Sequence, residues 1–175
     1  QDEVNFNSYQ FIEFKEELIK LDQLTDIFSN NYKAIALDFE LVTEGRKSKS
    51  ISTTNNIIGE ESIFIEEGAV LEFVTINASE GPVYIGKDAL VMEGSLIRGP
   101  FSIGEKSVVK MGAKIYGGTT IGPNCTVGGE IKNVVMFGNS NKGHDGYLGN
   151  SVVGEYCNFG ADTNCSNMKN NHSSI

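Results

Sequence analysis

The residues with the clearest chemical potential lie in one short run near the C-terminal end of the sequence. The run Asn141-Lys142-Gly143-His144-Asp145-Gly146 holds one of the two histidines of the chain. An imidazole titrates near neutral pH, so His144 has the chemistry of a general acid or base. A lone histidine in a stretch rich in Gly and Asn is more often an ordinary surface residue, and the run alone leaves both interpretations open. The other histidine, His172, lies in a terminal Asn/Ser tract and is expected at the surface.

The charge of the chain limits its partners. A net charge of −9 repels phosphate backbones and anionic lipid, so we expect no nucleic-acid partner and no membrane partner. No apolar run is long enough to span a bilayer, and the N-terminus lacks the pattern of a signal peptide. We therefore expect a cytoplasmic protein. An anionic small substrate would need a local cation, and Lys132 and Lys142 are candidates.

The cysteines indicate free thiols rather than a disulfide framework. Cys125, Cys157 and Cys165 are odd in number and lie at repeat positions, where cysteine behaves as a small buried hydrophobe. Free thiols are typical of a reducing compartment. No spacing of His, Cys, Asp or Glu argues for a dedicated site for a metal, so we expect no metal cofactor.

The elements that must position these residues follow from a period of six. An aliphatic residue occupies every sixth position over residues 85–127, and a mostly small residue follows four positions later. The aliphatic positions are Ile85, Val91, Ile97, Ile103, Val109, Ile115, Ile121 and Val127. This period fits neither a helix nor a flat strand, but it fits a polygonal coil with six residues on each side. The pattern predicts a mainly β protein, a parallel β-helix of 18-residue triangular coils over residues 51–175.

The period continues in two other phases. The first comprises Ile58, Phe64, Val70 and Ile76, and the last comprises Tyr147, Val153, Phe159 and Cys165. Residues 77–84 and 133–146 separate the three phases. Insertions that break the register of a solenoid project as loops, and loops carry function on such scaffolds. The second break therefore directs attention to His144.

Residues 1–50 differ from the repeat and predict a helical segment. Apolar residues recur here at intervals of three and four, namely Phe11, Phe14, Leu18, Leu21, Leu24, Ile27, Phe28 and Ile35. Asp22 or Thr25 is expected to cap a second helix that runs toward Phe39, with Gly45 as its stop signal and a polar linker at 45–50. We expect this segment to cover one end of the β-helix.

The other end of the predicted β-helix has no closing cap. The repeat stops near the last residue, Ile175. A terminal coil without a cap leaves strand edges unpaired. We therefore expect a β-helix truncated at its C-terminal end, and a chain that is part of a longer protein.

The hexads resemble those of a known family. Ile85-Gly86-Lys87-Asp88-Ala89-Leu90 and Ile103-Gly104-Glu105-Lys106-Ser107-Val108 look like the repeats of the left-handed β-helix in bacterial hexapeptide acyltransferases. The runs 141–150 and 153–163 are similar to segments of the acetyltransferase half of bifunctional sugar-phosphate nucleotidyltransferases, which make UDP-N-acetylglucosamine from glucosamine-1-phosphate. The resemblance is closest over residues 128–167.

This resemblance implies acetyl transfer from acetyl-CoA to an amino-sugar phosphate, with His144 as the general base. A base poised near neutrality can take the proton as the sugar amine attacks the thioester. The implied substrate-binding residues are Lys132, Lys142, Tyr147, Asn158 and Asn167. The implied acyl-donor residues are Ala161 and Thr163. The family also implies a homotrimer with sites between subunits.

Two positions depart from the family pattern, and a second hypothesis stands beside the enzyme. Asp162 replaces a small glycine, and Met168 stands where the family has tyrosine. The helical segment followed by hexads also resembles fusions in which a nucleotidyltransferase domain precedes the β-helix. The alternative is therefore a non-catalytic β-helix module that trimerises or regulates a nucleotidyltransferase domain outside this chain. Asn158 has a structural alternative of its own, an asparagine stack at a corner of the coils.

Overall fold

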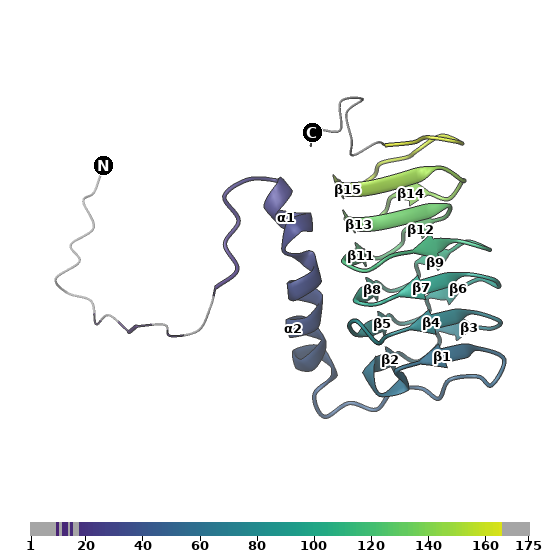
Figure 1. The fold of residues 1–175 in the computed structure, drawn as a ribbon, viewed down its shortest axis with the longest axis horizontal. Helices are drawn as coiled ribbons and strands as arrows, with labels where there is room; N and C mark the ends of the chain where they lie inside the picture. The colour runs from purple at the N-terminus through teal and green to yellow at the C-terminus, as the bar shows by residue number, and fades with distance from the viewer. Residues whose placement is uncertain (1–9, 11, 14, 16–17, 166–175) are drawn as a thin grey trace.

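Stacked coils built from short parallel strands and turns make up most of the protein. The computed structural model describes residues 10, 12–13, 15 and 18–165, and Figure 1 shows the strands as a stack beside two helices. Each strand pairs in parallel with the strand one coil away. The predicted mainly β, parallel β-helix with a preceding helical segment is therefore confirmed, with about five turns of about 18 residues.

The strands form three faces, which we number in chain order. Face I comprises β1 (Asn56–Ile58), β4 (Thr75–Asn77), β7 (Leu96–Arg98), β10 (Lys114–Ile115) and the first halves of β13 (Glu130–Met136) and β15 (Tyr147–Val153). Face II comprises β2 (Ile63–Ile65), β5 (Val83–Ile85), β8 (Phe101–Ile103), β11 (Thr119–Ile121) and the second halves of β13 and β15. Face III comprises β3 (Val70–Leu71), β6 (Leu90–Val91), β9 (Val108–Val109), β12 (Thr126–Val127) and β14 (Asn141–Lys142). A short 3₁₀ turn, η2 (Glu60–Ser62), precedes β2.

The core lies inside the coils and follows the period of six. All eight aliphatic side chains of the phase 85–127 are at most 2% exposed. The residues four positions later are buried as well, from Ala89 and Ser95 to Cys125 and Ile131. Inward aliphatic side chains therefore stack in columns along the axis, and small side chains fill the space between them. Burial of apolar surface in these columns is the main source of stability.

The glycine that opens each Ile-Gly hexad marks a close approach between coils. A Cβ atom at Gly104 would lie 2.7 Å from the nitrogen of Pro123 and 2.8 Å from the carbonyl carbon of Gly122. Gly86 and Gly122 face the coils above them in the same way. Only glycine allows the backbone to pack this closely, which explains the motif.

The first predicted phase is wrong at three positions, Ile58, Phe64 and Val70. Ile58 and Val70 are 55% and 49% exposed, whereas Leu71 is buried and pairs with Val91 in the core. Ile65 pairs with Ile85, which makes this coil 20 residues long rather than 18. The extra residues displace the inward positions of the first coil, and Phe64 faces outward to stack on Tyr84.

The last predicted phase is also displaced. Leu148, not Tyr147, pairs with the core residue Ile131, and Val153 is inward as predicted. Cys165 is exposed. The coil before this phase is short, because Val127 pairs with Lys142 only 15 residues later. The pattern of six therefore fails where a coil loses residues.

The two helices, α1 (Thr25–Ser29) and α2 (Asn31–Thr43), lie along face II and do not cover an end, as Figure 1 shows. This corrects the predicted position. Asn31 anchors α2: its Nδ2 donates to the carbonyl oxygen of Gly118 at 2.6 Å, and its Oδ1 accepts from Thr120 Oγ1 at 3.0 Å. A helix lies along face II because the outward positions of β8 and β11, Ser102 and Thr120, are small.

The bounds of the helices differ partly from the prediction. Residues 18–24 form no helix, and the positions of Phe11 and Phe14 lie outside the described residues. No side chain of Asp22 or Thr25 caps α1. Instead, the carboxylate of Asp26 in the first turn accepts from the backbone N–H groups of Asp22 and Gln23, which precede the helix. Gly45, with φ +67°, follows the end of α2 as expected.

The first coil is covered by the segment 47–51, which the sequence indicated only as a linker. The N–H of Lys49 donates to the carbonyl oxygen of Ile65, and Ser48 Oγ accepts from the N–H of Ile65. The side chain of Ile51 packs on the core. A polar linker thus supplies hydrogen bonds to the edge of the first coil, which would otherwise be unpaired.

Candidate functional site

His144 lies in the loop 143–146 between β14 and β15, at the corner where face III turns into face I. Its side chain is exposed. Asn141 Oδ1 accepts from the N–H of Gly143 at 3.1 Å, and the carbonyl oxygen of Gly146 accepts from the N–H of Glu130 in the coil below. The loop is therefore held at both of its ends, and it presents the imidazole to solvent.

Tyr147 and Asn158 lie next to this loop. Tyr147 begins β15, and its N–H donates to Asn164 Oδ1 at 2.8 Å. Asn158 lies one coil above Asn141, whose Nδ2 donates to Asn158 Oδ1 at 2.7 Å. Asn158 therefore pairs with another asparagine, as the structural alternative expected, but along the strands of face III rather than at a corner.

The segment 161–163 crosses directly above the loop. The backbone of Asp162 and Thr163 contacts Gly146 closely enough that a Cβ atom at this glycine would collide with the carbonyl oxygen of Thr163. Ala161 and Thr163 are exposed, and Thr163 Oγ1 donates to the carbonyl oxygen of Gly160. The fold thus brings His144, the predicted sugar-binding residues Tyr147 and Asn158, and the predicted donor-binding residues to one corner. Asn167 lies outside the described residues.

Lys142 is buried in the core and is not available as the substrate-binding cation that was predicted. Its side chain points into the solenoid at the position of an inward aliphatic residue, in register with Val127, and is 2% exposed. The ammonium donates to the carbonyl oxygens of Gly128, His144 and Gly146 at 3.0, 2.8 and 2.9 Å. Because all three donors are used, Lys142 has none left for a phosphate. Burial lowers the pKa of Lys142, and the negative charges of Asp145 and Asp162 partly oppose this shift.

Lys132 is exposed on face I, one coil below Gly149. Its ammonium lies 6.0 Å from the centre of the Tyr116 ring. Lys132 therefore lies outside the group at the corner, and it is the exposed cation among the predicted binding residues.

The remaining candidate groups do not form a second centre. Within residues 18–165 and the few described before them, no group of three His, Cys, Asp or Glu side chains could hold a metal ion. The three cysteines are free, and burial raises the pKa of the Cys125 thiol. No helix among the described residues is long and apolar enough to cross a membrane.

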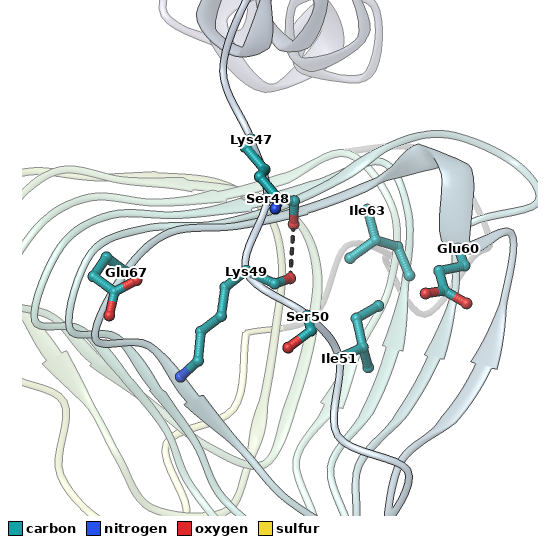
Figure 2. Close-up of a pocket in the computed structure, with 8 residues that line it drawn as sticks. All are labelled: Lys47, Ser48, Lys49, Ser50, Ile51, Glu60, Ile63 and Glu67. Atoms are coloured by element: carbon teal, nitrogen blue, oxygen red, sulfur yellow. Dashed lines mark hydrogen bonds between the residues drawn. The ribbon is translucent and has the colours of Figure 1, made fainter.

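A large cavity lies at the other end of the solenoid, below the first coil. Figure 2 shows the residues that line this cavity of about 640 Å³, which are Lys47, Ser48, Lys49, Ser50, Ile51, Glu60, Ile63 and Glu67. Lys49 Nζ donates to the carbonyl oxygen of Ala69, and Ser48 Oγ donates to that of Lys49. The lining combines two lysines with two glutamates and therefore favours neither sign of ligand. No pattern in the sequence predicted this cavity, because it forms only when the segment 47–51 crosses the open coil.

Comparison with known proteins assigns no function to this chain, so its function is inferred from the candidate site. No protein-family model and no curated protein matches this sequence.

Proposed function

We propose that this chain is the β-helix part of an N-acyltransferase that acts on a phosphorylated amino sugar, with acetyl-CoA as donor. One observation carries the proposal: Asn158 and the segment 161–163 stack above β14 and the loop 143–146, which carries His144 and leads into Tyr147. A single exposed base beside polar groups suits direct transfer without a covalent enzyme intermediate.

In the proposed reaction, the amine of the sugar attacks the thioester carbonyl and His144 takes the proton from the amine. The carbon–sulfur bond then breaks, and the thiol of coenzyme A leaves with a proton. Asn158 and Tyr147 hold the hydroxyls of the sugar. The carbonyl of His144 is fixed by Lys142, which orients the loop that carries the base.

The test is an assay of thiol release from acetyl-CoA with glucosamine-1-phosphate as acceptor. We expect turnover by the full chain and a loss of about 10²–10⁴-fold in kcat/KM for His144→Ala, because general-base catalysis contributes about that factor. Lys87→Ala, at an exposed position three coils below, is the matched control and keeps the full rate. Absence of thiol release by the unaltered protein excludes this substrate pair, and an unchanged rate in His144→Ala excludes His144 as the base.

A second candidate function is a non-catalytic module that assembles a homotrimer and regulates an attached nucleotidyltransferase domain. It is favoured by face I, where the outward side chains of Ile58 and Leu96 are half exposed beside Tyr116. A flat apolar face is a surface on which copies of a chain can associate. Sedimentation that gives a trimer, together with no thiol release for any amino-sugar phosphate tried, supports this function over the enzyme.

A further inference from the structure

A cavity lies between α2 and face II, and none of the residues assigned to acyl transfer lines it. Its volume is about 290 Å³, close to the lower limit for pockets that hold small molecules. The helix forms one wall, and the outward side chains of β5, β8 and β11 form the other. The helical wall is mainly apolar, with Ala34, Ile35, Phe39 and Val42. The cavity can therefore enclose the apolar body of a small ligand.

The cavity stays open because α2 is held at both of its ends. At the first turn, Asn31 Nδ2 donates to the carbonyl oxygen of Gly118 at 2.6 Å. Just after the last turn, the guanidinium of Arg46 donates to the carboxylate of Glu66 at 2.8 Å and lies 5.0 Å from the centre of the Phe64 ring. The middle of the helix, which runs along the stack of strands in Figure 1, cannot close onto the sheet without breaking one of these contacts.

The hydroxyl groups of the sheet wall offer mainly hydrogen-bond acceptors. The hydroxyl of Thr120 donates to Asn31 Oδ1 at 3.0 Å, and that of Tyr84 donates to the carboxylate of Glu66. Both oxygens keep a lone pair that can accept a further hydrogen bond. The hydroxyl of Ser102 has no partner among the described residues. A ligand that carries hydrogen-bond donors therefore matches this wall.

The charge of the lining favours a cation. Asp38 supplies a carboxylate, and no Lys or Arg lies among the described residues that line the cavity. Asp38 is exposed and therefore lies at the opening, where it has no ion-pair partner in the described part of the chain. An ammonium forms strong hydrogen bonds with a carboxylate, and an aromatic ring such as that of Phe39 also attracts a cation.

We propose that this cavity binds a small organic amine in its charged form. The ammonium lies at Asp38, where it also reaches the hydroxyl oxygens of the sheet wall. The apolar body of the amine lies between Ala34, Phe39 and the strands. The inference does not depend on acyl transfer, since the cavity and the loop that carries His144 share no residue.

The experiment is calorimetric titration of the full chain with phenethylamine, an amine with an aromatic body. We expect binding of phenethylamine and none of phenylacetate, which has a similar shape and the opposite charge. Asp38→Asn should weaken the binding of phenethylamine by about tenfold or more, because it removes the charge-assisted hydrogen bond. Glu40→Gln is the matched control: it removes the same charge from an exposed position of α2 that does not line the cavity, and it keeps the affinity.

A second variant locates the bound amine. Ala34→Leu places a larger side chain in the cavity while keeping a strong helix former in α2, so we expect it to abolish binding. Circular dichroism checks that each variant is folded. Absence of binding to the unaltered protein at millimolar phenethylamine overturns the proposal. Equal weakening in Asp38→Asn and Glu40→Gln overturns it too, because the amine is then attracted only by the net charge of the chain. Unchanged binding in a folded Ala34→Leu shows that the amine binds elsewhere.

Discussion

Lys142 and His144 are joined by a hydrogen bond from the buried ammonium of the lysine to the carbonyl oxygen of the histidine, at 2.8 Å. The same ammonium binds the carbonyl oxygens of Gly128 below the loop and Gly146 at its end. A cation in the core column thus serves as the internal support of the loop 143–146. The buried lysine therefore holds the backbone of the loop that exposes the candidate base.

Lys142→Met is expected to keep the fold and loosen this loop. Methionine fills the same space in the column, but it leaves three carbonyl oxygens without their ammonium donor. A buried polar group without a partner costs about 1–3 kcal/mol, which is partly offset because the buried charge is removed. We expect a lower free energy of unfolding in urea and faster amide exchange over residues 143–146.

Lys114→Met is the control for this prediction, because Lys114 is exposed on face I and its ammonium is not buried. It should leave both the stability and the exchange rates unchanged. Amide protection in Lys142→Met equal to that of the unaltered protein would show that the loop does not depend on the ammonium.

Gly104→Ala is expected to destabilise the solenoid strongly. The new methyl group would lie 2.7 and 2.8 Å from backbone atoms of Pro123 and Gly122, which can separate only if two coils move apart. Overpacking of this kind typically costs about 1–3 kcal/mol. The matched control is Gly154→Ala at the same motif position of the last coil, where the methyl group would meet, among the described residues, only Cys157 Sγ at 3.9 Å. Thermal unfolding measures both, and equal melting temperatures would contradict the prediction.

The sequence predicted the regular part of the solenoid and failed where the coils change length. Ile85 and Val127 lie in an unbroken run of 18-residue coils, so a count of six is sufficient to place them inside. Val70 was misplaced because its coil has 20 residues, and only the pairing with Leu90 reveals its outward position. No count could place Lys142 in the core either, since a lysine becomes an inward residue only through the 15-residue step from Val127.

The candidate site was predicted as a set of residues, not as a geometry. Resemblance brought together His144, Tyr147 and Asn158, and the stacking of coils now explains why they are neighbours. The position of the helices was missed, because the pattern of α2 shows an apolar stripe but not which surface covers it. The sequence did contain one indication of the helix position. Ser102 and Thr120 are small side chains at neighbouring outward positions of face II, and they leave room for a helix.

Asn31→Ala is expected to weaken the contact between α2 and face II. The side chain of Asn31 is 7% exposed and bonds to both Gly118 and Thr120, so its loss leaves a buried carbonyl oxygen and a hydroxyl without partners. We expect a loss of about 1–3 kcal/mol in the free energy of unfolding. A double-mutant cycle with Thr120→Val checks the origin of this loss. The effects should be less than additive if the two side chains act through their shared hydrogen bond, and full additivity would argue against that contact.

Glu66 makes the stability of the solenoid sensitive to acid. The guanidinium of Arg46 donates to its carboxylate at 2.8 Å and the hydroxyl of Tyr84 donates as well, and both hold the pKa of Glu66 below its ordinary value of 4.5. The folded protein therefore binds this proton less readily than the unfolded chain. The stabilisation is complete above pH 4.5 and is lost as the pH falls from there through the lower pKa of the folded state.

Glu66→Gln removes this titration and is expected to flatten the acid limb of the stability curve. Below pH 4.5 the free energy of unfolding of the unaltered protein should fall more steeply than that of Glu66→Gln, and above it the two curves should run parallel. Glu67→Gln is the matched control, since the neighbouring Glu67 is exposed. Urea unfolding at a series of pH values measures the difference. Parallel curves over the whole acid range would mean that Arg46 and Tyr84 do not hold the carboxylate in its charged form.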